Sequence, residues 1–260
     1  MTKIRLKNSK RKNLNVPGEQ PGTLRHDVTM EIQTMLAQRL IRGRERSEEV
    51  NPIVGVIGFG QRTGALWRAA ESDDPYADWV LLRIEESLQS IKKSIDSHSK
   101  RIGEVLEAMD GFEIDIAQSS EPARIPLQFN NPYGYMVAYL VSDFDKLSCK
   151  VLTARHLGLI ERQRSDEILR EAGRGIRRLL NCAFEWRFTG VNREDIRQQN
   201  QNAARAQQQM GNVPADVLSG QKRARMAPQI HSGKNSASPT EGVETPKGSR
   251  ATESPKSLPH

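Results

Sequence analysis

A long run of helical periodicity constrains the fold of this chain most strongly. Behind Ser72, Asp73 and Asp74, which suit a helix N-terminus, apolar residues recur at spacings of three and four from Pro75 to about Gly111. The run predicts a helix of about 33 to 35 residues, which is long for a globular protein. Such a helix with a charged outer face packs as an antiparallel hairpin or a coiled-coil arm, so the run favours a dimer.

Other segments predict a mainly α fold with a few short β-strands, an α+β arrangement. Alternating apolar and polar residues predict strands over 24–32, 112–117 and 124–130. Periodicity and capping signals predict a helix over 35–41 that Gly43 ends, and another that includes Leu66 and Trp67. They also predict a helix over 132–156, one that Ser165 caps and that reaches about Leu180, and one over about 192–209.

The charge lies in the two ends of the chain. Residues 1–12 carry six basic and no acidic residues, and residues 221–260 carry seven basic and three acidic ones, so 13–220 hold 26 basic against 29 acidic residues. We expect a disordered basic arm over 1–22, one mostly helical domain over 23–220 and a disordered basic tail over 221–260. Basic arms attract polyanions, so the charge is consistent with DNA as a partner.

Several function classes have no support in the sequence. No apolar stretch could span a membrane and none follows the basic start, so we expect a cytoplasmic protein without a signal peptide. Cys149 and Cys182 lie in predicted helices and are expected to be reduced core residues. The glycines of 55–60 lack the rest of a dinucleotide or phosphate-loop motif, and tight packing around a turn explains them. The histidines show no metal-ligand spacing, so we expect no enzyme, metal or cofactor.

Arginines on the predicted helix after Ser165 form one candidate site. Arg162 and Arg164 lie in the predicted loop that leads into this helix. On the helix itself, one stripe of arginines consists of Arg170, Arg174, Arg177 and Arg178. Free N–H groups at a helix N-terminus next to arginines can hold a phosphate, with Ser165 as the cap. The alternative is a solvated face paired with Glu167 and Glu171. Another cluster, Arg39, Arg42, Arg44 and Arg46, could merely complement the dipole of its own helix.

The strand over 124–130 forms the other candidate site. Its outward residues would be Arg124, Gln128 and Asn130, which are side-chain types that read base edges in a major groove. Strand, helix, turn and arginine-bearing helix is the order of a ribbon-helix-helix unit, in which two chains pair their strands on DNA. The strand over 24–32, with Arg25 and Thr29 outward, is the rival ribbon.

Four segments resemble a proteobacterial protein family encoded by integrating conjugative elements. They are 73–79, 126–135, 152–159 and 190–197, and the resemblance covers about 23–220. The family is similar to AcaB, a ribbon-helix-helix activator of conjugative-transfer genes in plasmids. The resemblance implies a transcriptional regulator, but it assigns no DNA-contacting residue.

The sequence therefore predicts a dimeric DNA-binding regulator of transfer genes on a mobile element. The alternative is a structural or adaptor component of the conjugation machinery that contacts other transfer proteins through the long helix.

Overall fold

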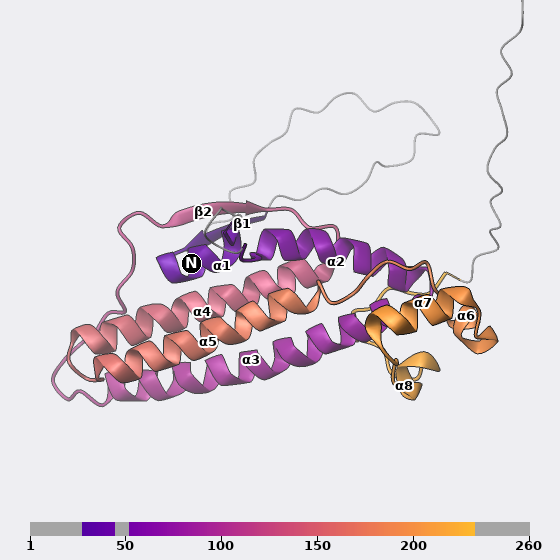
Figure 1. Cartoon of the computed structure of the whole chain (residues 1–260). Coiled ribbons are helices and arrows are strands. Elements are labelled where there is room, and N and C mark those ends of the chain that lie inside the picture. Colours follow the sequence, from indigo (N-terminus) through magenta and orange to yellow (C-terminus); the bar gives the residue numbers. More distant parts are fainter. Residues whose placement is uncertain (1–27, 45–51, 232–260) are drawn as a thin grey trace, which may run out of the picture.

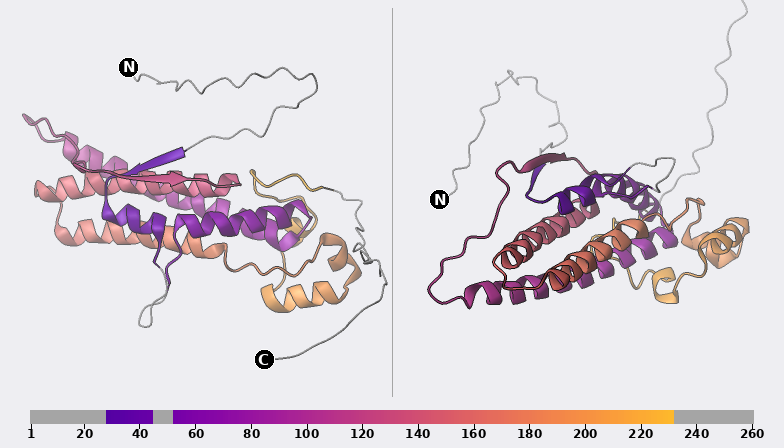
Figure 2. Two further views of the ribbon diagram at one scale, coloured as in Figure 1. Left: turned by 90° about the horizontal axis from the view of Figure 1, so that it is seen from above. Right: turned by 60° about the vertical axis from the view of Figure 1, so that its left-hand side comes forward.

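The computed structural model describes residues 28–44 and 52–231, and these form an elongated helical bundle with a small sheet on one side (Figures 1 and 2). The fold is mainly α with one two-stranded sheet, as the sequence predicts. Within the described residues the strands are β1 (Val28–Ile32) and β2 (Ala123–Leu127), and the helices are α1 (Met35–Arg42), α2 (Val56–Glu71), α3 (Pro75–Glu107), α4 (Pro132–His156), α5 (Arg162–Cys182), α6 (Arg193–Gln198), α7 (Gln201–Met210) and α8 (Ala215–Leu218).

The predicted long helix is α3. Asp74 caps it by accepting hydrogen bonds from the backbone N–H groups of Tyr76 and Ala77. The helix packs against α2, α4 and α5, so neighbours in the same chain cover its apolar stripe (Figure 1). The long helix is therefore part of the bundle, and its length alone no longer argues for a coiled-coil dimer.

The core of the bundle is built around α4, which is buried on most of its surface. Asn131 caps this helix by accepting from the N–H groups of Tyr133 and Gly134. The ring of Phe129 occupies the space where a Cβ on Gly60 or Gly134 would lie. The predicted turn around residues 55–60 is wrong for Gly60, since it lies inside α2 and is small because an aromatic ring packs on its backbone.

The two strands pair with each other in one antiparallel ribbon. Their register places Val28 opposite Leu127 and Met30 opposite Ile125. Met30, Ile125 and Leu127, together with Ile32, are buried against the helices, so one face of the ribbon belongs to the core. Both candidate strands of the sequence analysis therefore form a single ribbon within one chain. Residues 24–27 of the first predicted strand lie outside the described residues.

The strand predicted over 112–117 is absent from the described part of the chain. Phe112 is exposed, while Ile114 and Ile116 pack against the core from an extended connection. The backbone N–H of Ala117 donates to Oγ1 of Thr153 on α4 and not to a strand. Alternation alone gave the prediction, and the segment has no partner strand to complete a ladder.

Two helix boundaries and the end of the packed region differ from the sequence prediction. α5 begins at Arg162, so Ser165 lies inside the helix and does not cap it. The predicted last helix is broken between α6 and α7, where Gln199 adopts a left-handed backbone with φ of 52°. Segment 221–231, which composition assigns to the tail, packs on the bundle, where Arg223 forms two hydrogen bonds to Asp78 of α3. The ordered contacts thus continue beyond residue 220.

Candidate nucleic-acid interface

The outer face of the β1–β2 ribbon presents a continuous row of exposed side chains. Because side chains alternate along a strand, burial of the inner row leaves the other row in solvent. Gln128 and Asn130 extend this row beyond the last residue of β2. The predicted base-reading residues therefore share one exposed surface, which consists of Thr29, Glu31, Arg124, Pro126, Gln128 and Asn130.

A buried carboxylate on α4 fixes one end of the ribbon. Asp145 accepts hydrogen bonds from the backbone N–H of Gln33 (2.7 Å), the backbone N–H of Thr34 (2.9 Å) and the hydroxyl of Thr34 (2.6 Å). Thr34 also caps α1. The corner between β1 and α1 is thus attached to the central helix. No local pattern in the sequence signals this role of Asp145, because its partners are more than a hundred residues away.

Within the ribbon, Arg124 lies against Glu31 on the neighbouring strand. Nε of Arg124 is 3.7 Å from a carboxylate oxygen of Glu31, and both side chains are largely exposed. An exposed ion pair of this kind contributes about 0 to 1 kcal/mol. The guanidinium can therefore leave Glu31 for a stronger acceptor at little cost.

The predicted phosphate site at the start of α5 does not join the ribbon. Ser165 is fully buried and its hydroxyl has no partner in the described residues, so it cannot touch a ligand in solvent. Arg164 is paired with Glu167 (3.3 Å). α4 leads the chain away from the ribbon to the left-hand end of the bundle in Figure 1, and Arg162 begins α5 at that end. From Asp145, which holds the β1–α1 corner, to His156 at the end of α4 the chain rises by roughly 16 Å at about 1.5 Å per residue.

Arg170 and Arg174 lie on a different surface, a groove of about 720 Å³ between α3 and α5. Their Nε atoms donate to the carbonyl oxygens one turn earlier on α5. Glu167 and Glu171 line the same groove. The groove is therefore mixed in charge.

Two of the family segments meet in a buried ion network at the start of α3. Arg193 donates to carboxylates of Asp73 and Asp78 and to the carbonyls of Val217 and Leu218. Asp78 is fully buried, and Arg223 also binds it. The network attaches α6, α8 and the segment after them to α3, so these motifs have a structural role.

Next to this network, Asp74 has an unusual environment. Its second carboxylate oxygen accepts a hydrogen bond from the indole N–H of Trp186 (3.1 Å). Burial raises the pKa of the Asp74 carboxyl to about 6, against the hydrogen bonds from Ala77, Trp186 and Tyr76 that favour the ionised form. This carboxyl is part of the fold and faces the interior.

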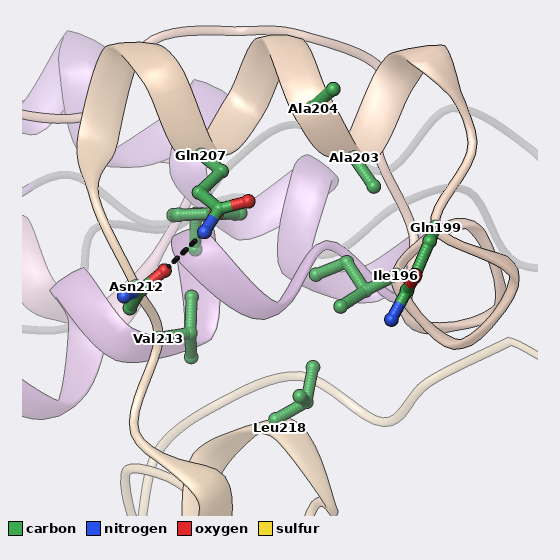
Figure 3. Close-up of a pocket in the computed structure, with 9 residues that line it drawn as sticks. Ile196, Gln199, Ala203, Ala204, Gln207, Asn212, Val213 and Leu218 are labelled. Atoms are coloured by element: carbon green, nitrogen blue, oxygen red, sulfur yellow. Dashed lines mark hydrogen bonds between the residues drawn. The ribbon is translucent and has the colours of Figure 1, made fainter.

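A cavity of about 490 Å³ lies between α3 and the C-terminal helices (Figure 3). The amide of Gln207 donates to Asn212, and the hydroxyl of Tyr76 donates to the carbonyl of Gly211. Ile196, Val213 and Leu218 add apolar surface. The lining has no charged side chain, so the cavity has no cation with which to neutralise a phosphate.

Other kinds of site are also missing from the described ranges. No three His, Cys, Asp or Glu side chains within 28–44 and 52–231 gather as metal ligands. No helix among these residues has both the length and the apolarity for a membrane span. Cys149 and Cys182 are buried free thiols, as expected from their predicted helices.

Comparison with known proteins identifies the class to which this protein belongs. The sequence model of a family described as "Transcriptional regulator AcaB" matches residues 20–231, and the class is therefore that of transcriptional regulators. The chain belongs to the AcaB family. The match includes the segment after residue 220 that packs on α3. The relationship to AcaB inferred from the four sequence segments is confirmed.

A solved structure has a similar fold. The crystal structure of selenomethionine-containing AcaB from uropathogenic E. coli superposes with a TM-score of 0.51 at 15% sequence identity, covering 76% of this chain and 98% of that chain. No curated protein matches the chain.

Proposed function

We propose that the chain is a DNA-binding transcriptional regulator that reads sequence with the outer face of the β1–β2 ribbon. A major groove admits a two-stranded ribbon, and arginine, glutamine and asparagine side chains can bond to base edges there. Arg124, Gln128 and Asn130 would make these contacts. The observation that carries the proposal is an antiparallel ribbon with a buried apolar face and an exposed polar face, in a chain of a transcriptional-regulator family.

The order of elements supports this assignment. β1 is followed by α1 and α2, β2 is followed by α4 and α5, and the two strands pair antiparallel. A ribbon-helix-helix dimer makes the same strand pairing between two chains. Here a single chain would supply a complete ribbon, so a homodimer would offer two ribbons to two half-sites. The regulated genes would be conjugative-transfer genes of an integrating element.

Mobility shift on promoter fragments from the chain's own genetic neighbourhood tests the proposal, with unrelated DNA as competitor. Gln128→Ala should reduce the ratio of specific to nonspecific affinity by about tenfold, since one base contact contributes about 1 to 3 kcal/mol of discrimination. Gln163→Ala, an exposed glutamine on α5, is the matched control and should leave the ratio unchanged. Equal affinity of the wild type for all fragments would refute the proposal.

The groove between α3 and α5 favours a second function, as an adaptor that binds other transfer proteins. Its alternating Arg and Glu side chains with Ile91 beneath suit a protein helix better than a polyanion. A charge-reversal pair in the groove, Arg174→Glu with Glu171→Arg, should abolish partner binding and leave DNA binding intact. Loss of DNA binding in that variant would contradict the adaptor role of the groove.

A further inference from the structure

The outer face of the ribbon carries an acidic side chain directly opposite a basic one. Glu31 of β1 faces Arg124 of β2 in the antiparallel register, and both side chains are on the exposed side of the ribbon. Nε of Arg124 lies 3.7 Å from Oε2 of Glu31. A carboxylate at this position is unexpected on a surface that binds DNA, because the phosphates of the duplex repel it. Glu31 therefore needs a compensating partner in the groove.

The other oxygen of the Glu31 carboxylate is held by a chain of hydrogen bonds. Nε2 of Gln33 donates to Oε1 of Glu31 (3.1 Å), and Oε1 of Gln33 accepts from the backbone N–H of Ser119 (3.0 Å). A backbone N–H can only donate, so Ser119 fixes which end of the Gln33 amide faces Glu31. The backbone N–H of Gln33 donates to the buried carboxylate of Asp145 (2.7 Å). The carboxylate of Glu31 is therefore oriented before DNA binds.

The contact between Glu31 and Arg124 is loose enough to be replaced. The side chain of Arg124 is 77% exposed and that of Glu31 is 48% exposed. An ion pair with this exposure is weak, because water screens both charges. Oε2 of Glu31 and the guanidinium of Arg124 can therefore exchange this contact for partners in a groove, while Gln33 keeps its hold on Oε1.

The second arginine cluster of the sequence does not belong to the ribbon. Arg39 of α1 and Arg177 of α5 line a recess between these two helices. Arg46 of the same cluster lies outside the described residues. A charged contact from the ribbon to a base therefore depends on the pair that the ribbon itself carries, Glu31 with Arg124.

The pair is complementary to the groups that one C·G base pair presents in the major groove. From guanine to cytosine these groups are the acceptors N7 and O6 and then the donor N4, whereas an A·T pair presents an acceptor, a donor and an acceptor. A guanidinium donates to N7 and O6 of guanine, and a carboxylate accepts from N4 of cytosine. O6 and N4 are hydrogen-bonded to each other, so the two sites are adjacent, as Glu31 and Arg124 are. In an A·T pair the central donor would face the guanidinium or the outer acceptors would face the carboxylate.

We propose that Glu31 is a base-reading residue and that Glu31 and Arg124 together read one C·G base pair. Glu31 accepts from N4 of cytosine, and Arg124 donates to O6 and N7 of guanine. This inference rests on the proposed function for the position of the ribbon in the groove, and it adds the base pair that is recognised. At any other base pair the Glu31 carboxylate is left without a donor among the phosphates, so it also penalises binding to other sequences.

Selection of duplexes from a randomised DNA library by the full-length chain tests this assignment. Sites that the wild type selects should contain a C·G pair at one position that becomes unconstrained in both Glu31→Ala and Arg124→Ala. Replacing this base pair should weaken wild-type binding by about tenfold or more and should leave the affinity of Glu31→Ala/Arg124→Ala nearly unchanged. Glu31→Gln should shift the preference from cytosine towards adenine, because a glutamine amide bonds to N6 and N7 of adenine.

Glu121→Ala is the matched control. Glu121 is an exposed acid two residues before β2 and outside the exposed row of the ribbon. Removing either carboxylate should raise the affinity for unrelated DNA, because one negative charge near the phosphates is lost. Only Glu31→Ala should also lose the preference for the C·G pair, and this difference separates base reading from charge.

The outcomes separate this inference from the proposed function. An unchanged preference in Glu31→Ala overturns the inference, and so does the relaxation of different positions in Glu31→Ala and Arg124→Ala, or an equal loss in Glu121→Ala. In each case a position that Gln128→Ala relaxes still supports the reader. Equal affinity of the wild type for all duplexes overturns both. Thermal unfolding verifies that each variant is folded.

Discussion

Removal of Arg193 should destabilise the chain strongly. The side chain is 4% exposed and donates to two carboxylates and two backbone carbonyls. Breaking a buried ion pair by removing one partner costs about 3 to 5 kcal/mol. Arg223 still binds Asp78 in Arg193→Ala, so we expect the lower end, about 3 kcal/mol. For a domain of this size the melting temperature should fall by about 6 to 12 °C.

Urea denaturation followed by circular dichroism and by tryptophan fluorescence measures this loss. Arg197→Ala is the matched control, because Arg197 has an exposed pair with Glu194 and should change stability by about 0.5 kcal/mol or less. Arg193→Ala/Arg223→Ala should cost more than the two single changes together, because Asp78 then has no cation. A loss below about 1 kcal/mol in Arg193→Ala, or additive single changes, would refute the reasoning.

Three further predictions concern stability and its pH dependence. Burial raises the pKa of Asp74 from 3.8 to about 6, so the folded state favours the protonated form, and this stabilisation is full below about pH 4 and lost as pH rises through about 6. Relative to Asp74→Asn, the wild type should lose about 3 kcal/mol between pH 4 and pH 7 in urea titrations, and a parallel pH dependence would contradict this. Gly60→Ala should lower the free energy of unfolding by about 1 to 3 kcal/mol, because the new Cβ would lie 2.2 Å from the Phe129 ring. Gly58→Ala, the control, should raise the free energy of unfolding by about 0.5 to 1 kcal/mol. Equal thermal shifts of the two glycine variants would contradict the packing argument. Asp145→Ala should lower the free energy of unfolding by about 2 to 4 kcal/mol, since three hydrogen bonds to the β1–α1 corner are lost. It should also weaken selective DNA binding at temperatures where the variant is still folded. Unchanged selectivity in mobility shift would show that this corner does not position the ribbon.

Local signals in the sequence determined most helices. The start of α3 behind Asp74 and the bounds of α4 follow from caps and apolar periodicity, which act over a few residues. The outward side of β2, with Arg124, and the exposure of Gln128 just after it follow from strand alternation in the same way. The prediction failed for residues 112–117, where the alternation is present but no strand pairs with it.

Only the tertiary structure decided which distant segments meet. The pairing of β1 with β2 and the contacts of Asp78 with Arg193 and Arg223 join segments about 90 to 145 residues apart. Complementary packing and charge, which no local pattern contains, determine these contacts. The tertiary structure also separated two sets of arginines that look alike in the sequence. Arg164 pairs with Glu167 in the first turn of α5, while Arg39 and Arg177 meet in a recess between α1 and α5, because α5 returns along the bundle after α4.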